Sequence, residues 1–309
     1  MDMLCLGETL IDFKATGTLA FQGYPGGSPM NVAIAAARLE AAVGFASQAS
    51  SDQFGSFLRR YIADNGVDTS LLEHSDAPST LAFVSEIDGE AHFDFMANGT
   101  ADSLYDPQPR PVLPASVKVV FFGSISLLQD PAAQAITDIV RAHRDQATVV
   151  FDPNVRPALI ADRTQYLQQL PAWLELCHIA KVSTQDLRWL YPEQAIDSIA
   201  AQWLAQGVPA VIITQGSQGA SLYRQGQEPL QSTSPQVDVV DTVGAGDTFS
   251  GALMVELLTH SRTASFRDFS NDTWQRIVGT AIAAAAYNCT QAGANPPTRQ
   301  ALDDFMAKV

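Results

Sequence analysis

The sequence predicts an α/β protein in which a mostly parallel central sheet is covered by helices. Two observations carry this prediction. Short apolar stretches alternate with helical stretches from residue 117 onward, and a glycine-rich segment at 241–251 runs directly into a strong helical pattern. Strand and helix in alternation imply right-handed crossovers and parallel pairing, because each helix must pack back onto the sheet.

The first 65 residues predict two strands and two helices. A buried strand at 3–10 runs on to Phe13, and residues 23–27 (GYPGG) form a turn. Ser28 is expected to cap a helix that has Pro29 at its first position and ends near Leu39. A strand at 43–49 and an amphipathic helix at 54–65 follow. Asp12 therefore stands at the end of the first apolar run.

A hairpin is predicted at residues 80–96, because Asp88-Gly89 separates two strand-like runs. A two-residue turn places Ala82 and Val84 on one face together with Phe95, and leaves Phe83 on the other face. Apolar residues on both faces suit a flap that covers a site on one side and meets a second protomer on the other. An ordinary hairpin inside the main sheet is the alternative.

The second half of the chain predicts the alternating part of the fold. Strands are expected at 117–123, 148–152, 179–182 and 210–214, with helices at 131–143, 164–176 and 196–206. A hairpin at 220–224 and 228–232 precedes helices at 246–258, 273–288 and 298–307. Ligands of such sheets bind beyond the carboxyl ends of the strands. Asp12, Asp152, Thr214-Gln215-Gly216 and residues 241–247 fall there.

The composition excludes several kinds of partner. The chain has 309 residues, with 18 Lys+Arg against 33 Asp+Glu and a formal charge of −15. This acidity, without a basic run, argues against nucleic acid or an anionic membrane as partner. The sequence shows neither a membrane-spanning stretch nor a signal peptide. Cys5, Cys177 and Cys289 lie far apart without paired spacing, which is typical of a cytoplasmic protein.

The segment Asp241-Thr242-Val243-Gly244-Ala245-Gly246-Asp247 predicts an anion site at the start of a helix. Small residues let backbone N–H groups converge there, and the helix dipole favours negative charge. The carboxylate of Asp247 should repel such an anion, which makes sense if it takes a proton from a hydroxyl that attacks phosphorus. The alternative is that Asp247 only caps the helix.

Five segments together resemble the ribokinase/PfkB family of carbohydrate kinases, most closely its fructokinases. They are residues 26–33 (GGSPMNVA), 152–156 (DPNVR), 214–219 (TQGSQG), 241–253 (DTVGAGDTFSGAL) and Gly293-Ala294, in the order of the family. The resemblance implies one three-layer ribokinase-like domain over 1–309, with a mostly parallel sheet flanked by helices and a small β lid from about 13–24 and 80–102. It also implies ATP as donor, a sugar hydroxyl as acceptor and a homodimer through the lid.

The resemblance also assigns roles to individual residues. Asp247 matches the catalytic base, and Asp241 with the backbone of Val243 matches a monovalent-cation site that K⁺ fills in some relatives. The anion hole would be Gly244, Ala245 and Gly246; the acceptor contacts Asp12, Gly26, Gly27, Asn31 and Arg156; and the nucleotide contacts Thr214, Gly216, Ser217 and Gly219, beside Gly244 and Gly246.

Each role has a structural alternative. Asp12 could be paired with neighbouring backbone, although an unpaired carboxylate after an apolar strand suits hydroxyl binding. Gly26-Gly27 could only turn the chain, and residues 214–219 could be a plain strand-to-strand turn. Arg156 could bind phosphate or a surface carboxylate. Asn31 is a mediocre helix former inside a helix, which favours a contact role.

Two positions depart from the family pattern. The family usually has Asn, then Glu three residues later, after a lysine, and this pair helps to hold hydrated Mg²⁺. Here Lys181 is followed by Ser183 and Asp186. Asp186 keeps the negative charge of the family's Glu on a shorter side chain, so it is the residue expected to help hold Mg²⁺. Ile282 replaces the Asn that relatives often place beside adenine.

The acceptor is expected to be fructose. No G-x-x-x-x-G-K-[ST] loop is present, which excludes a P-loop kinase. Kinases for 2-keto-3-deoxygluconate usually carry a lid arginine for the acid group, where this chain has Ala97. Asp102 could contact the sugar or cap the next turn. The alternatives are a 2-keto-3-deoxygluconate kinase or ribokinase-type activity, and a non-catalytic sugar or nucleotide sensor. A nicotinamide-dependent oxidoreductase is a further alternative, but the glycine fingerprint of that class does not follow the first strand.

Overall fold

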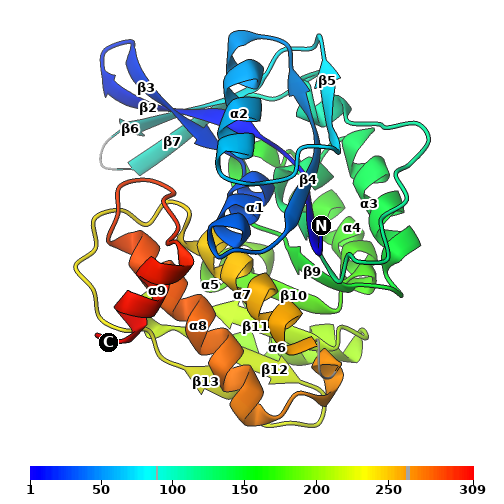
Figure 1. The fold of residues 1–309 in the computed structure, drawn as a ribbon, viewed down its shortest axis with the longest axis vertical. Coiled ribbons are helices and arrows are strands. Elements are labelled where there is room, and N and C mark those ends of the chain that lie inside the picture. The colour runs from blue at the N-terminus through cyan, green and yellow to red at the C-terminus, as the bar shows by residue number, and fades with distance from the viewer. Residues whose placement is uncertain (88–89, 262–264) are drawn as a thin grey trace.

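The computed structural model describes residues 1–87, 90–261 and 265–309. Its described residues build one nine-stranded sheet that forms the centre of the molecule (Figure 1). The spatial order of the strands is β13 (Leu230–Ser232), β12 (Ala220–Arg224), β11 (Ala210–Thr214), β10 (Ile179–Ser183), β9 (Thr148–Asp152), β8 (Val119–Gly123), β1 (Met3–Leu6), β4 (Val43–Ser50) and β5 (Leu72–Ser75). Neighbouring strands from β11 through β5 pair in parallel, whereas β12 pairs antiparallel with both β11 and β13.

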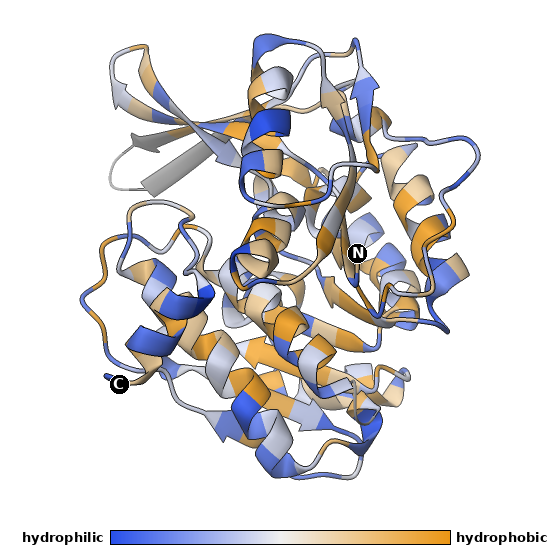
Figure 2. Cartoon of the chain, in the orientation of Figure 1, coloured by the Kyte–Doolittle hydropathy of each residue, from blue (hydrophilic) through white to orange (hydrophobic). Residues whose placement is uncertain are grey.

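Helices cover both faces of this sheet, which confirms the predicted three layers. One apolar core lies under α1 (Ser28–Arg38), α2 (Gln53–Asp64), α7 (Ala245–Ser261), α8 (Asn271–Cys289) and α9 (Arg299–Met306). The other lies under α3 (Ala132–His143), α4 (Arg163–Leu176), α5 (Thr184–Leu190) and α6 (Ile196–Ala205). Both faces need cover because the strands are apolar on both sides. In β1, Met3 and Cys5 point into the first core, and Leu4 and Leu6 point into the second. The apolar strands in Figure 2 lie between these two layers.

A separate four-stranded sheet stands away from the body (Figure 1), and we call it the small sheet. Its order is β3 (Ala20–Gly26), β2 (Leu10–Gly17), β6 (Thr80–Ile87) and β7 (Glu90–Met96). Ala82 pairs with Phe95, as the predicted register requires, whereas the turn at Asp88-Gly89 lies outside the described residues. The alternative of a hairpin inside the main sheet is therefore wrong. Phe13 stacks on Phe83 at 5.2 Å between ring centroids and meets Phe54 of α2 edge-on.

The predicted first strand was wrong in its extent. The chain leaves the main sheet after Leu6 and enters the small sheet at Leu10, so one apolar run serves two sheets. The break falls at Glu8, whose buried carboxylate accepts hydrogen bonds from Ser28 N and Ser126 Oγ. Gly7-Glu8-Thr9 interrupts the apolar run in the sequence, but the prediction joined its two halves into one strand.

The predicted turn at 23–27 was also wrong. Residues up to Gly26 belong to β3, which pairs antiparallel with β2 from Leu10 opposite Gly26 to Gly17 opposite Ala20. Pro25 is tolerated because β3 is the edge of the small sheet, where a missing N–H breaks no ladder. The short elements β5 and α5 were not predicted, and the remaining boundaries moved by a few residues.

Helix α1 also begins differently from the prediction. Gly27 is its N-cap, with no side-chain hydrogen bond, and Ser28 is the first helical residue. The hydroxyl of Ser28 makes a contact in the site instead. Among the helices of the described segments, none is long and apolar enough to cross a membrane.

Candidate active site

The start of α7 lies at the carboxyl edge of the main sheet and has the form of an anion site. Gly244 has φ +76°, and a Cβ there would lie 2.5 Å from Cβ of Ala294, so only glycine fits this turn. Ala245 N donates to Thr242 O at 3.2 Å, and Thr248 N donates to Gly244 O at 2.8 Å. The amides of Gly246 and Asp247 come between these bonds, where a helix start leaves N–H groups for an anion.

Asp247 is held from a different helix. Its Oδ1 accepts from Ser28 Oγ at 2.7 Å and its Oδ2 accepts from Asn31 Nδ2 at 2.9 Å, both on α1. Neither hydrogen bond caps α7, although Asp247 lies in its first turn. These two donors fix the orientation of a half-buried carboxylate beside the anion site. Asn31 was predicted to contact the acceptor, which stays a prediction; in the structure its side chain contacts Asp247. The contact from Ser28 was missed.

Asp12 reaches the same site from β2 of the small sheet. A Cβ on Gly26 would overlap Oδ2 of Asp12, so Gly26 leaves room for this carboxylate. Burial raises the pKa of Asp12 to about 6, while the charge of Arg156 lowers it and that of Asp247 raises it further. No described residue donates a hydrogen bond to the Asp12 carboxylate. It is therefore a free acceptor, as binding of a hydroxyl-rich ligand requires.

Gly27 joins this group through close packing. Its φ is +112°, and a Cβ would lie 2.6 Å from Glu8 O. Glu8 itself was missed by sequence reasoning, although an acidic residue inside an apolar run is a signal for a buried contact. Its carboxylate links the start of α1 to the short turn Ser124–Leu127, and burial raises its pKa.

A buried ion pair lies beneath the anion site. Lys181 Nζ on β10 donates to Asp152 Oδ2 on β9 at 2.7 Å, and the two residues are 4% and 1% exposed. Asp152 Oδ1 also accepts from Asn154 N at 3.1 Å. Arg156 is exposed and donates to Asn154 Oδ1 at 2.6 Å, and among the described residues it makes no hydrogen bond to a surface carboxylate. A lysine within the apolar strand was the signal for this pair.

Asp186 is committed to a capping box at the start of α5. Its Oδ1 accepts from Val155 N at 3.0 Å, and its Oδ2 accepts from Ser183 N at 3.1 Å and Ser183 Oγ at 2.7 Å. These bonds leave the carboxylate little capacity to coordinate a metal directly. In the described part of the chain, no group of three or more His, Cys, Asp or Glu side chains could hold a metal ion.

The predicted nucleotide segment follows β11 at the same edge of the sheet. Thr214 pairs with Ser183, two residues beyond Lys181 on the neighbouring strand. Gly216 and Ser217 form an exposed turn, which leaves their backbone open to a ligand. Gly219 is buried against Ser232 O, where a Cβ would overlap the carbonyl. Gly219 therefore has a packing role whether or not it also meets a nucleotide.

The predicted cation residues are tied together by backbone contacts. Asp241 Oδ1 accepts from Val243 N at 3.0 Å, and Oδ2 accepts from Gly293 N at 3.1 Å. Val243 O accepts from the buried Asn288 Nδ2 at 2.8 Å, and Asn288 was missed because one Asn in an apolar helix gives a weak signal. Ile282 is buried in α8 and packs in the first core.

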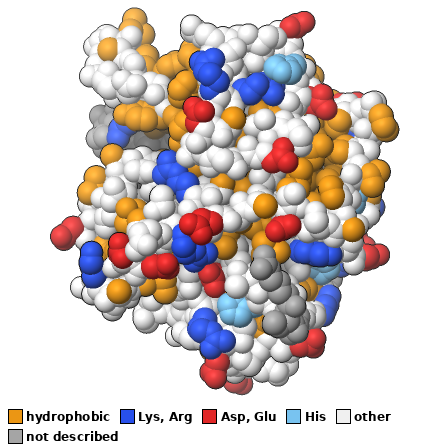
Figure 3. Space-filling view, in the orientation of Figure 1, with side chains coloured by type: hydrophobic (Ala, Val, Ile, Leu, Met, Phe, Trp, Pro, Cys, Tyr) orange, Lys and Arg blue, Asp and Glu red, His pale blue; other side chains and the backbone are white. Residues whose placement is uncertain are grey.

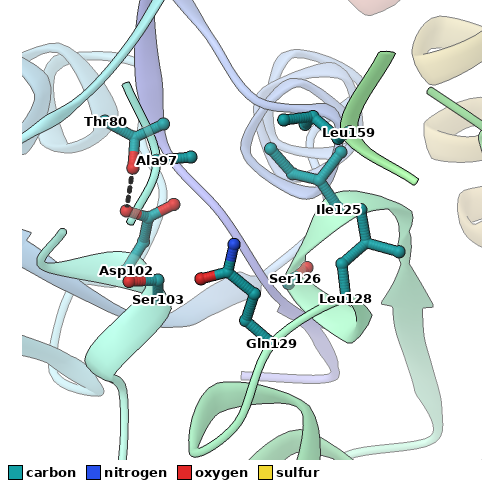
Figure 4. A pocket seen from close by; sticks show the side chains of 9 residues that line it. All are labelled: Thr80, Ala97, Asp102, Ser103, Ile125, Ser126, Leu128, Gln129 and Leu159. Atoms are coloured by element: carbon teal, nitrogen blue, oxygen red, sulfur yellow. Dashed lines mark hydrogen bonds between the residues drawn. The ribbon is translucent and has the colours of Figure 1, made fainter. Parts of the chain in front are cut away.

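A pocket lies between the small sheet and the turns that follow β8 and β9 (Figure 4). Asp102 forms its wall, with Oδ1 accepting from Thr80 and Thr100, and burial raises the pKa of Asp102 to about 6. Gln129 reaches across to the small-sheet side and donates to Asn98 Oδ1 at 3.0 Å. None of its described lining residues is a lysine or arginine: Thr80, Ala97, Asp102, Ser103, Ile125, Ser126, Leu128, Gln129 and Leu159.

The chain is similar to known proteins over most of its length. Residues 2–301 match the family model described as pfkB family carbohydrate kinase. A fructokinase from Rhizobium leguminosarum bv. trifolii is 33% identical over 259 residues, covering 82% of this chain and 79% of that protein. A probable fructokinase-2 from Arabidopsis thaliana is 31% identical over 306 residues, covering 95% of this chain and 92% of that protein.

Solved structures agree with the sequence relatives. A fructokinase from Xylella fastidiosa with bound ATP superposes with a TM-score of 0.89 at 27% identity, covering 99% of this chain and 98% of that one. Aminoimidazole riboside kinase from Salmonella enterica, complexed with aminoimidazole riboside and an ATP analogue, gives 0.83 at 27% identity, covering 99% and 98%. These matches confirm the ribokinase-like fold. The chain belongs to the pfkB family of carbohydrate kinases and is a sugar phosphotransferase.

Proposed function

We propose that this kinase transfers the γ-phosphoryl group of MgATP to the 6-hydroxyl of D-fructose. The observation that carries the proposal is a pair of carboxylates in different states. Asp247 has both oxygens held by Ser28 and Asn31 beside the anion site, whereas no described residue donates a hydrogen bond to the carboxylate of Asp12. Two such groups can divide the work of proton removal and hydroxyl binding between them.

The proposed reaction uses Asp247 as general base. The sugar oxygen attacks the γ-phosphorus, its proton passes to Asp247, and the bond from phosphorus to the β–γ bridging oxygen breaks, leaving the electron pair on ADP. The amides at Gly244, Ala245 and Gly246 are assigned to the phosphoryl oxygens, with Gly246 the best placed because Ala245 N is paired with Thr242 O.

Acceptor recognition is assigned to the small sheet and α1. Asp12 would accept from sugar hydroxyls, beside Gly26, Gly27 and Asn31, and Arg156 would approach the phosphoryl group from the end of β9. A neutral sugar fits better than an acid sugar, because the nearby pocket holds Asp102 and no cationic side chain among its described residues. Fructokinase relatives and the riboside kinase from Salmonella enterica also support a neutral acceptor.

The donor is assigned to the edge formed by β10 and β11. Thr214, Gly216, Ser217 and Gly219 would line the nucleotide, and the bound ATP of the Xylella fastidiosa relative supports this choice. Mg²⁺ neutralises charge on the ATP phosphates when bound. Because the Asp186 carboxylate is occupied, we assign it contact with Mg²⁺ through water only. Asp241 and Val243 remain the proposed K⁺ residues.

A homodimer through the small sheet is a further part of the proposal. Leu19 is 90% exposed on this sheet, and Phe21, Tyr24 and Met96 are also exposed. Figure 3 shows apolar side chains on the protruding small sheet. Exposed apolar groups clustered in this way suit a protein interface. Light scattering should give about twice the chain mass, and a monomer at working concentration would contradict the dimer.

The direct test of function is ADP release with MgATP and K⁺ across fructose, ribose, 2-keto-3-deoxygluconate, glucose and adenosine. We expect a strong response to fructose. A stronger response to 2-keto-3-deoxygluconate or ribose would keep the sugar kinase and overturn the acceptor. Saturable ligand binding without ADP release on any acceptor would instead support a non-catalytic sensor.

A further inference from the structure

Lys181 carries a buried ammonium group with spare hydrogen-bonding capacity. Its side chain is 5% exposed, and the one hydrogen bond that it makes within the described residues goes to Asp152 Oδ2. An ammonium group has three N–H donors, so two remain without a partner in the described part of the chain. Unused donors on a buried charge are unfavourable unless a ligand or water completes them.

The ammonium group faces the start of α7. A Cβ placed on Gly246 would lie 3.2 Å from Lys181 Nζ, so this nitrogen adjoins the turn to which the phosphoryl group is assigned. Burial lowers the pKa of Lys181, but the charges of Asp152, Asp186 and Asp247 together raise it above its ordinary value. Lys181 therefore stays protonated next to a cluster of carboxylates that would otherwise repel an incoming triphosphate.

We propose that Lys181 is a ligand of the transferring phosphoryl group of ATP, with its two free N–H donors directed at phosphoryl oxygens. This inference rests on the proposed function. During transfer the phosphorus leaves the bridging oxygen of ADP and bonds to the sugar oxygen, and the sugar proton goes to Asp247. Lys181 keeps its own proton and stabilises the negative charge on the phosphoryl oxygens. Asp152 positions the ammonium group from the neighbouring strand.

A purely structural role explains these observations less well. Two buried charges cost desolvation free energy, and well-packed apolar residues often replace such a pair without loss of stability. The neighbours Ala180 and Val182 on β10 are buried apolar residues, so the strand does not itself require a charge. The pair lies where the proposed reaction needs a positive charge.

Three variants test the proposal. Lys181→Met removes the charge with similar length, Asp152→Asn removes its partner, and the double variant Lys181→Met/Asp152→Asn leaves no unpaired charge to disturb folding. Lys118→Met is the matched control, because Lys118 is exposed. The measurements are kcat and KM for fructose, together with calorimetric binding of ADP and of the analogue AMP-PNP, which carries a γ-phosphate.

We expect both variants that lack Lys181 to lose about 10²- to 10³-fold in kcat, as when one donor of an oxyanion hole is removed. The KM for fructose should stay within about threefold. Affinity for AMP-PNP should fall by about tenfold more than affinity for ADP, because only the analogue carries the group that Lys181 contacts. Lys118→Met should change none of these values.

Two results would overturn the assignment. A double variant with kcat within about threefold of wild type would show that Lys181 only neutralises Asp152. Equal weakening of ADP and AMP-PNP would exclude a contact with the γ-phosphate. If the wild type phosphorylates no sugar, the proposed function fails separately, and the nucleotide comparison still decides: selective loss of AMP-PNP affinity supports Lys181 as a phosphate ligand, and no selective loss overturns it.

Discussion

Asp247 and Asp12 approach one site from two different parts of the molecule, and their surroundings differ sharply. Asp247 lies at the start of α7, where donors from α1 occupy both of its oxygens. Asp12 lies on the small sheet, where Gly26 leaves space for its carboxylate and no described residue donates to it. A carboxylate that the protein holds fixed suits chemistry, and one that the protein leaves free suits binding.

The largest expected effect comes from Asp247→Asn. The amide keeps the size of the side chain but cannot accept the sugar proton, so kcat should fall by about 10²–10⁴-fold. Binding of fructose should change much less. Steady-state kinetics and fructose binding by calorimetry check this, with the exposed Asp64→Asn as control. Near-wild-type turnover in Asp247→Asn would remove this residue from the mechanism.

Asp12→Asn should act mainly on KM. Replacing a charged acceptor by an amide weakens the hydrogen bonds to the sugar, and a hydrogen bond to a charged group contributes about 1.5–3 kcal/mol, so KM for fructose should rise about 10- to 100-fold. The loss in kcat should be smaller than in Asp247→Asn. An unchanged KM would mean that the free carboxylate is not a sugar contact.

Ser28→Ala tests whether the fixed state of Asp247 matters. The variant removes one of two donors to this carboxylate and leaves the α1 backbone intact, since Ser28 N is held by Glu8. We expect kcat to fall by about tenfold, in line with one hydrogen bond to a charged group. A control is Ser116→Ala, whose hydroxyl bonds a distant exposed backbone group. Equal activity of both variants would show that this orientation is not needed.

The smallest effect concerns stability and its pH dependence. The pKa of Asp12 is about 6 in the folded protein against an ordinary 3.8, so the folded state binds this proton more tightly. The stabilisation of the folded state by this bound proton is fully present below about pH 4 and is lost as the pH rises through 6. At pH 7 the ionised carboxylate is therefore destabilising, and Asp12→Asn should raise the free energy of unfolding by about 1 kcal/mol after discounting for partial exposure.

Chemical denaturation of both proteins at pH 4, 5, 6 and 7 measures that difference. The gain in Asp12→Asn should shrink as pH falls from 7 toward 4. A gain that is constant with pH, or largest at pH 4, would show that the Asp12 carboxylate is not strained by burial in the folded protein.

Much of the fold could be predicted because its signals are local. The alternation after residue 117 gives the parallel strands and their helices, and Asp88-Gly89 gives the register of β6 and β7. The early chain could not be predicted in the same way. One apolar run serves both β1 and β2, and Glu8, which contacts Ser28 and Ser126, lies at the break between them.

The site shows the same limit. Asp247, Asp12 and Asn31 were predicted as site residues, because their types conflict with their local positions in ways that a function resolves. The contacts of Ser28, Lys181 and Asn288 depend on partners 29 to 219 residues away, and no local pattern encodes such distances. Asp186 was predicted from the sequence as a magnesium residue, and its role in the capping box of α5 was not predicted.

The most direct measurement compares wild type, Asp247→Asn and Asp12→Asn side by side for kcat and for the fructose dissociation constant. The account predicts that the effects separate, with Asp247→Asn losing turnover while it binds fructose normally, and Asp12→Asn losing affinity while it retains most of its turnover at saturation. If both variants lost mainly turnover, or both lost mainly fructose affinity, the division of roles between Asp247 as base and Asp12 as sugar contact would be contradicted.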